Sequence, residues 1–305
     1  MVRLRIRSLL VLLGLSLVFS FSACQSSEIP AGSSSPLAGT VHKDVIYSSS
    51  NGADLRLDIH YPNLVNGPIP TVVYVHGGAW IQGDKEEGAG TVDMPALLEA
   101  GFAVVAVNYR LAPEYKFPAM IEDVKCAIRF LRANADRYGL ATEKIGAYGG
   151  SAGGHLVSLL GLTDSSAGWD SGEYAEYSSR AQAVVDMFGP TNLRGPFSPE
   201  APVRCEDVFG TCNVNDPVLR DASPVTWVSA DDPPFLILHG DKDEVVPLSQ
   251  SETLYERLRD AGIEVTLVVV KNGEHGLWPR ADMEPSRSQL SEMIVEFFVR
   301  HLLGS

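Results

Sequence analysis

Positive charge is scarce in this sequence of 305 residues, in which 24 lysines and arginines stand against 38 aspartates and glutamates. The resulting net charge of −14 gives a surface that repels phosphate groups, so we expect neither nucleic acid nor anionic lipid head groups as partners. Histidine and cysteine are also scarce, and they do not occur at the spacing of metal ligands. The sequence therefore predicts no metal ion and no organic cofactor.

A long apolar run is missing everywhere except near the N-terminus, where residues 9–21 are almost wholly apolar. Three arginines precede this run, and Ser22-Ala23-Cys24 follows it closely. A basic stretch, a short apolar stretch and small residues before a cut site are typical of an export signal, which we predict for residues 1–23. The run is too short for a comfortable membrane span.

Small residues directly before Cys24 also resemble the bacterial lipoprotein signal. In that interpretation Cys24 is lipidated, becomes the new N-terminus and is the only attachment of the protein to a membrane. The alternative is an ordinary cleaved signal followed by secretion. The polar, serine-rich residues 24–40 indicate a flexible tether, which an anchored protein would need. Residues 41–305 then form a single folded domain.

The remaining chain alternates between strand patterns and helix patterns. Lys43–Tyr47 and Leu55–His60 alternate polar and apolar residues, which predicts an antiparallel pair of strands. Six almost wholly apolar runs predict strands buried on both faces: Thr71–Val75, Ala103–Val107, Ile145–Tyr148, Ala183–Met187, Phe235–Leu238 and Val265–Val270. Helical patterns separate them: Ile121–Arg137, Ser151–Gly161, Ser251–Ala261 and Arg287–Leu303. The order predicts an α/β fold with a mostly parallel eight-stranded sheet and helices on both faces.

Residues 190–228, called the insertion below, break this rhythm because they are rich in Pro, Asn, Asp and Gly. An insertion here would lie near the carboxyl edge of the sheet, where ligands bind in open α/β folds, so it predicts a small cap. The alternative is a long surface connection. Cys205 and Cys212 lie within the insertion, and in an oxidising compartment they would form a disulfide rather than two free thiols. Cys126 lies in a helical pattern and is expected to be buried.

The strongest chemical signal is Gly149-Gly150-Ser151-Ala152-Gly153-Gly154, which joins a predicted buried strand to a predicted helix. Strand, sharp turn, serine and helix form the arrangement called a nucleophile elbow. The glycines permit a turn that would clash with side chains. The sequence therefore predicts Ser151 as a nucleophile.

A serine hydroxyl needs a base to remove its proton, and the acid and histidine of such a triad follow the serine along the chain. Asp243 follows the strand Phe235–Leu238, and Asp241 is its rival, although Asp241 is better placed to cap the turn. His275 follows the next predicted strand on a glycine-rich loop. We expect Asp243 to orient His275, and His275 to act as the general base.

Attack by Ser151 on a carbonyl carbon would form a tetrahedral oxyanion, which preorganised backbone N–H groups must stabilise by hydrogen bonds. The segment Val75-His76-Gly77-Gly78-Ala79-Trp80, which follows another strand, is suited to supply them. The expected donors are Gly78, Ala79 and Ala152. His76 is expected to brace this loop. Trp80 and Gly150 are expected to shape substrate binding, with Trp80 lining the pocket or packing beneath it.

Together these motifs resemble the α/β-hydrolase fold-3 esterases, which include the hormone-sensitive lipase family. His76-Gly77-Gly78 matches the oxyanion motif of these proteins, and Asn108–Glu114 with Phe117-Pro118-Ala119 matches a further segment. Gly150 stands where the lipase group has Asp, and Ala79-Trp80 replaces its third glycine. Both features are similar to the bacterial feruloyl/acetylxylan esterase-like (BD-FAE-like) branch and to arylformamidases.

The resemblance implies an α/β-hydrolase catalytic domain that acts as a serine carboxylic ester hydrolase. Its substrates would be short-chain esters or acetyl and feruloyl esters linked to carbohydrate, either small molecules or groups on polysaccharides. One alternative is amide chemistry with the same triad, as in an arylformamidase or a small exopeptidase. A second alternative is a non-catalytic binding protein on a hydrolase scaffold, which would typically have lost the nucleophile or the base.

Overall fold

The computed structural model describes residues 37–49, 54–195 and 205–304, all of which belong to one compact unit of the chain. The predicted export signal, most of the tether and Cys24 lie outside these residues. Among the residues described, no helix is long and apolar enough to cross a membrane.

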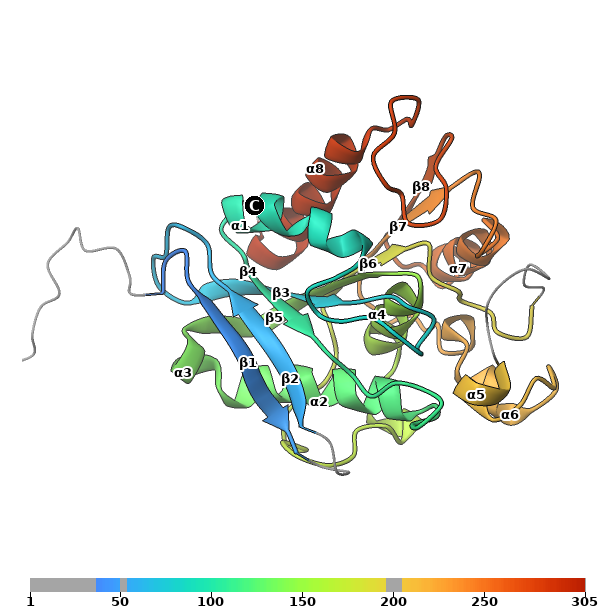
Figure 1. Cartoon of the computed structure of the whole chain (residues 1–305), viewed down its shortest axis with the longest axis horizontal. Helices are drawn as coiled ribbons and strands as arrows, with labels where there is room; N and C mark the ends of the chain where they lie inside the picture. The colour runs from blue at the N-terminus through green and yellow to red at the C-terminus, as the bar shows by residue number, and fades with distance from the viewer. Residues whose placement is uncertain (1–36, 50–53, 196–204, 305) are drawn as a thin grey trace, which may run out of the picture. The chain divides into compact units, whose positions relative to one another are not determined.

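Eight strands form one sheet in the order β1-β2-β4-β3-β5-β6-β7-β8 (Figure 1). β1 and β2 are antiparallel, β2 is also antiparallel to β4, and the other neighbours are parallel. The prediction of a mostly parallel eight-stranded sheet is therefore confirmed. The strands span Val41–Ser48 (β1), Leu55–His60 (β2), Ile69–Val75 (β3), Ala103–Val107 (β4), Leu140–Gly150 (β5), Ala183–Met187 (β6), Phe235–Gly240 (β7) and Val265–Val270 (β8).

Helices cover both faces of the sheet, as predicted. The buried hydrophobic side chains form two clusters, one on each face of the sheet. Alternate residues of β3 belong to different clusters, with Val73 and Val75 in the first and Val72 and Tyr74 in the second. The α-helices are Met94–Glu99 (α1), Ala119–Ala133 (α2), Ala135–Tyr138 (α3), Ala152–Leu162 (α4), Cys205–Phe209 (α5), Pro217–Asp221 (α6), Ser249–Asp260 (α7) and Arg287–Phe298 (α8). The first cluster includes side chains of α2, α4 and α7, and the second includes side chains of α1 and α8.

Two predicted helices are shorter in the structure. The pattern at 121–137 forms α2 and the short α3, because Asn134 leaves the helical conformation between them and the left-handed Gly139 ends α3. The pattern at 287–303 forms α8 followed by a π-helical turn at Val299–Leu303. Neither difference moves a residue of the predicted triad.

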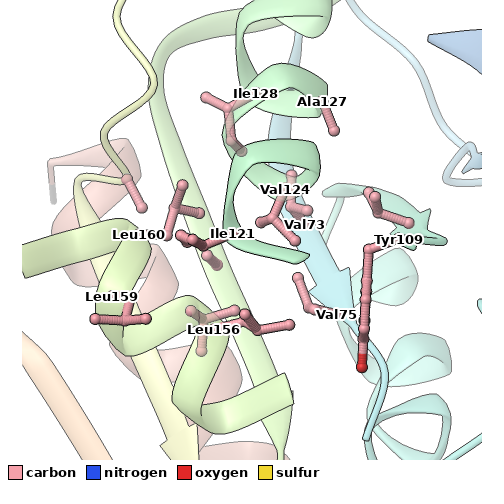
Figure 2. Close-up of a cluster of buried hydrophobic side chains, with 14 of the residues drawn as sticks. Val73, Val75, Tyr109, Ile121, Val124, Ala127, Ile128, Leu156, Leu159 and Leu160 are labelled. Atoms are coloured by element: carbon pink, nitrogen blue, oxygen red, sulfur yellow. The ribbon is translucent and has the colours of Figure 1, made fainter. Parts of the chain in front are cut away.

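The core between α2, α4 and β3 holds the start of α4 in place (Figure 2). Ile121, Val124 and Ile128 of α2 recur at the helical spacing and are fully buried. They pack in one cluster with apolar residues of α4 and β3: Val73, Val75, Leu156, Leu159 and Leu160. Because α4 begins directly after Ser151, this packing fixes the position of that serine.

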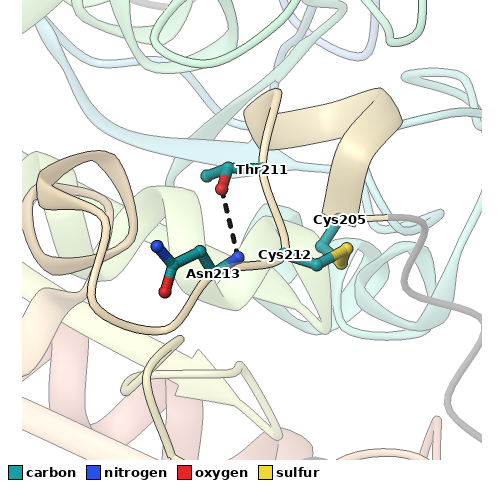
Figure 3. Close-up of a disulfide and its surroundings, with 4 residues drawn as sticks. All are labelled: Cys205, Thr211, Cys212 and Asn213. Atoms are coloured by element: carbon teal, nitrogen blue, oxygen red, sulfur yellow. Dashed lines mark hydrogen bonds between the residues drawn. A yellow bond between two sulfur atoms is a disulfide. The ribbon is translucent and has the colours of Figure 1, made fainter.

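The insertion contains α5, α6 and a short 3-10 turn at Pro224–Thr226. Cys205 and Cys212 form the predicted disulfide, with their Cα atoms 5.2 Å apart (Figure 3). Closing so short a loop restrains α5, and the loop-closure model gives about 2.5 kcal/mol of stabilisation for it. Cys126 is a buried free thiol, as expected.

Candidate active site

Ser151 lies at a strained turn between β5 and α4. Its φ of 56° and ψ of −121° are unusual for a residue with a side chain. A Cβ atom at Gly149 would lie 2.6 Å from the Val75 carbonyl oxygen, and one at Gly153 would lie 2.1 Å from the same oxygen. The elbow therefore requires these two glycines, and it presents the serine side chain at the carboxyl edge of the sheet.

Strand register brings the other loops to this edge. Val75 at the end of β3 pairs with Gly149, so the loop after β3 leaves the sheet beside the elbow. Gly240 of β7 pairs with Val270 of β8, so the loops that carry Asp243 and His275 also leave side by side. The carboxyl edge of a parallel sheet is where ligands bind in open α/β folds.

The three predicted triad side chains meet at hydrogen-bond distance. His275 Nε2 lies 3.0 Å from Ser151 Oγ, and His275 Nδ1 lies 2.8 Å from Asp243 Oδ2. An ionised carboxylate only accepts hydrogen bonds, so Nδ1 carries the proton and donates it to Asp243. Nε2 is then free to accept the hydroxyl proton of Ser151, which is what a general base requires.

Asp243 is held as a carboxylate. Its Oδ1 accepts hydrogen bonds from the backbone N–H groups of Val245 (2.9 Å) and Val246 (2.8 Å). Burial alone would raise the pKa of Asp243, but hydrogen bonds from His239 and His275, the favourable electrostatic interaction with the His275 imidazole and the Val246 amide together hold that pKa well below its usual range. The carboxylate therefore stays ionised in the range where imidazoles titrate.

Asp241, the rival acid, lies elsewhere. Its side chain is exposed and accepts a hydrogen bond from the backbone N–H of Asn272 at 2.6 Å. This contact ties the loop after β7 to the loop after β8. The structure thus brings Asp243, and not Asp241, to His275.

His239 contacts and supports the carboxylate of Asp243, a role that is not predicted from the sequence. It is fully buried, and its Nε2 lies 2.8 Å from the Val246 carbonyl oxygen and 3.3 Å from Asp243 Oδ2. Its Nδ1 lies 2.7 Å from Ser251 Oγ. Since the carbonyl can only accept, Nε2 carries the proton and Nδ1 accepts from the serine. The sequence feature that could indicate this role is a histidine within an otherwise apolar strand, four residues before an acid.

The loop after β3 has the form needed to bind an oxyanion. Gly78, Ala79 and Trp80 have φ values of 109°, 52° and 61° in succession. Within the described residues, the backbone N–H groups of Gly78 and Ala79 donate no hydrogen bond. Ala152 is the first residue of α4, where backbone N–H groups have no partner in the preceding turn. Two non-glycine residues in this region cost on the order of 1–3 kcal/mol each, so the surrounding structure must hold the loop.

His76 and Trp80 both pack into the protein around this loop. His76 is buried, stacks on the ring of Tyr109 with centroids 4.3 Å apart, and lies 2.7 Å from the Gly77 carbonyl oxygen through Nδ1. Trp80 is only 2% exposed and packs beneath the loop. Trp80 is absent from the cavity lining, so of its two expected positions it takes the one beneath the loop.

A cavity of about 580 Å³ opens above Ser151. Gly150 lines it, as expected, and a Cβ there would lie 2.8 Å from the ring of Phe188. No residue of the described part of the insertion lines it, so the cap remains a prediction. Its lining is His76, Gly77, Gly78, Ala79, Gln82, Gly83, Glu87, Gly88, Ala89, Gly150, Ser151, Phe188, Val245, His275, Gly276 and Trp278.

Trp278 and Glu87 also line the cavity, although neither is predicted from the sequence to do so. Trp278 is 52% exposed, which is unusual for a tryptophan on a protein surface. A Cβ at Gly276 would lie 2.5 Å from Trp278 Nε1, so the absence of a side chain at Gly276 gives the indole its place beside His275. Among the described residues, no group of three His, Cys, Asp or Glu side chains is placed to hold a metal ion.

A mostly parallel eight-stranded sheet with helices on both faces and a nucleophile elbow at its carboxyl edge defines the α/β-hydrolase fold. The chain belongs to the BD-FAE family, whose family model matches residues 57–258. The resemblance noted in the sequence is thereby confirmed.

Comparison with known proteins supports the same class. Esterase LipC of Mycobacterium tuberculosis is 34% identical over 226 residues, which are 72% of this chain and 55% of LipC. A truncated carbohydrate esterase from gut microbiota superposes with a TM-score of 0.71 and 29% identity, covering 88% of this chain and 98% of that one. The butyrate-bound thermophilic esterase Est2 of Thermogutta terrifontis superposes with a TM-score of 0.72 and 25% identity, covering 88% of this chain and 98% of that one. This chain spans about half the length of the curated relatives that it matches.

Proposed function

We propose that the protein is a serine carboxylic ester hydrolase for short-chain or carbohydrate-linked esters of the acetyl and feruloyl type. The observation that carries the proposal is the hydrogen-bonded chain Ser151–His275–Asp243, of which Ser151 and His275 line the same cavity as Gly78 and Ala79 with their unpaired N–H groups. Relatives named as esterases, and a structural neighbour named as a carbohydrate esterase, favour ester substrates.

In the proposed mechanism, Ser151 Oγ attacks the ester carbonyl carbon while His275 Nε2 takes the hydroxyl proton. The oxyanion accepts hydrogen bonds from the N–H groups of Gly78, Ala79 and Ala152. The tetrahedral intermediate then collapses, the bond to the alcohol breaks, and His275 gives its proton to the leaving oxygen. Water, activated by His275, hydrolyses the acyl-enzyme and regenerates Ser151. Asp243 stabilises the imidazolium in both steps.

A substrate panel tests this function. The panel comprises p-nitrophenyl acetate, acetylated xylan, methyl ferulate and N-formylkynurenine, each assayed with the wild type and with Ser151→Ala. We expect ester hydrolysis that depends on Ser151. Much faster cleavage of N-formylkynurenine than of every ester would make the protein an arylformamidase instead. No turnover and no labelling by a fluorophosphonate would indicate a binding protein on a hydrolase scaffold.

Trp278 is expected to contact the leaving alcohol, because His275 must protonate the leaving oxygen and Trp278 lies on the loop of His275. A sugar ring that covers one face of an exposed indole buries apolar surface worth roughly 1 kcal/mol, or about fivefold in affinity. We therefore expect Trp278→Ala to raise KM for acetylated xylan about fivefold, with a smaller rise for ethyl acetate, whose alcohol is too short to cover the indole. Trp278→Phe, which keeps an aromatic face, should lose less. Equal losses on both substrates would contradict a sugar-stacking role.

We infer that the protein works outside the cytoplasm, because the Cys205–Cys212 disulfide favours an oxidising compartment. The finer proposal is a lipoprotein anchored at Cys24. We expect Cys24→Ser to move esterase activity from the membrane fraction to the soluble fraction of the cells or the medium. Mass spectrometry of the mature wild-type N-terminus should find a diacylated Cys24, and an unmodified N-terminus at another residue would contradict the anchor.

A further inference from the structure

The oxyanion loop is anchored from below by a hydrogen bond from Trp80. The indole Nε1–H donates to His155 Nδ1 at 3.2 Å, and the two rings meet edge to face with centroids 5.0 Å apart. The backbone carbonyl of Trp80 also accepts the N–H of Ala112 at 2.9 Å. Trp80 is thus fixed at its side chain and at its backbone, while its own φ of 61° and that of Ala79 are strained.

His155 has only one protonation state that satisfies its neighbours. It is fully buried on α4, and its Nε2 lies 2.7 Å from the carbonyl oxygen of Ala222. The carbonyl can only accept and the indole N–H can only donate, so Nε2 carries the proton and Nδ1 does not. Burial lowers the pKa of His155 to about 4, which keeps this neutral form in place near neutral pH.

Two residues of the insertion support this pair. Ala222 follows α6 and accepts the hydrogen bond from His155. Phe209, at the end of α5, meets the Trp80 ring edge to face with centroids 5.3 Å apart. Phe209 lies within the loop closed by the Cys205–Cys212 disulfide, so its position is restrained. The described part of the insertion therefore reaches the oxyanion loop from beneath, although it does not line the cavity.

We propose that His155 is a positioning residue that holds the oxyanion loop in its catalytic conformation through Trp80, and that the insertion braces this pair. The proposal rests on the proposed function, because it assigns the N–H groups of Gly78 and Ala79 to the oxyanion. Without the hydrogen bond from Trp80 to His155, the loop can relax toward unstrained φ values. The N–H groups of Gly78 and Ala79 then no longer point at the oxyanion.

The test compares variants that remove one hydrogen bond each. Trp80→Phe keeps an aromatic ring at the position beside Phe209 but loses the N–H donor, and His155→Leu loses the acceptor. Loss of one oxyanion donor costs about 10²- to 10³-fold in other enzymes, so misalignment of a loop that is still present should cost about tenfold in kcat/KM on p-nitrophenyl acetate. The double variant should lose no more than about threefold beyond either single variant, because both break the same contact.

A second readout separates a positioning role from a purely structural one. A trifluoromethyl ketone forms a tetrahedral adduct with the serine and places its oxyanion in the hole, so its inhibition constant should rise by the same factor as kcat/KM falls. His155→Gln should restore activity to within about threefold of wild type, because the amide can accept from Trp80 and donate to Ala222. If Trp80→Phe does not fold, the comparison of His155→Leu with His155→Gln carries the test.

Tyr61→Phe is the matched control. Tyr61 is buried outside the insertion and the oxyanion loop, and its hydroxyl donates to the Tyr138 carbonyl at 3.0 Å. This variant should lose thermal stability while kcat/KM stays within about twofold of wild type. Additive losses in the double variant, or an unchanged inhibition constant, would overturn the brace. A wild type that hydrolyses no ester would instead overturn the proposed function, and inhibitor binding would then decide the brace alone.

Discussion

Replacement of Ser151 by alanine is expected to lower kcat on p-nitrophenyl acetate by about 10⁴- to 10⁶-fold, to the level of binding and oxyanion stabilisation alone. The physical reason is that no other nucleophile stands at the same point. His275 Nε2 lies 3.0 Å from Ser151 Oγ, and alanine leaves the base with no proton to take. The measurement is steady-state hydrolysis at high enzyme concentration, with burst kinetics on the wild type to detect the acyl-enzyme.

Ser158→Ala is the matched control for this loss. Ser158 lies two turns further along α4, is fully buried and donates a hydrogen bond to Asp186 at 3.0 Å. Its removal should lower stability, because a buried carboxylate loses a partner, yet kcat should stay within a few fold. Activity of Ser151→Ala close to wild type would show that another residue is the nucleophile.

The triad could be predicted because each member follows a strand that is visible in the sequence. Apolar runs mark β5, β7 and β8, and parallel strands deliver their following loops to one edge of the sheet. Ser151, Asp243 and His275 needed no knowledge of side-chain direction. The choice of Asp243 over Asp241 was weaker, since two acids two residues apart differ only in how the loop turns.

Residues that support the site from within could not be placed in this way. The sequence leaves Trp80 either in the pocket or beneath it, and no sequence pattern reveals the positive φ of this residue. His239 and His155 lie within an apolar strand and helix, where a histidine is hard to distinguish from a satisfied core residue. Their partners are a serine 12 residues away and a carbonyl 67 residues away, which only the folded chain brings near.

Replacement of Asp243 by asparagine is expected to lower kcat about 10⁴-fold, because the amide reverses a donor and an acceptor. Oδ1 of Asp243 already accepts two backbone N–H groups, so the asparagine oxygen must take that position. The amide NH₂ then faces Nδ1 of His275 and the Nε2–H of His239. To avoid a clash of donors, His275 must move its proton to Nε2, where it can no longer accept the proton of Ser151.

The same substitution has a pH-dependent effect on stability. The pKa of Asp243 is held below its unfolded value, so the carboxylate contributes stability that is fully present above the ordinary aspartate pKa of about 3.9 and is lost as the pH falls further. We expect Asp243→Asn to have a lower free energy of unfolding in urea than the wild type at pH 7. This difference in free energy should become smaller toward pH 3. An equal difference in the free energy of unfolding at pH 7 and at pH 3 would show that the charge of Asp243 does not stabilise the fold.

Asp241→Asn tests whether the loss of activity in Asp243→Asn comes from the triad carboxylate or from a change in the conformation of the loop. Asp241 accepts one hydrogen bond from the N–H of Asn272, and the asparagine side-chain oxygen can still accept it. Kcat should therefore stay within about threefold of wild type, even though the two acids share one loop. Because the two substitutions are chemically identical and two residues apart, a large loss at Asp243 alone assigns the effect to the hydrogen bond with His275. Equal losses at both positions would assign it to the conformation of the loop.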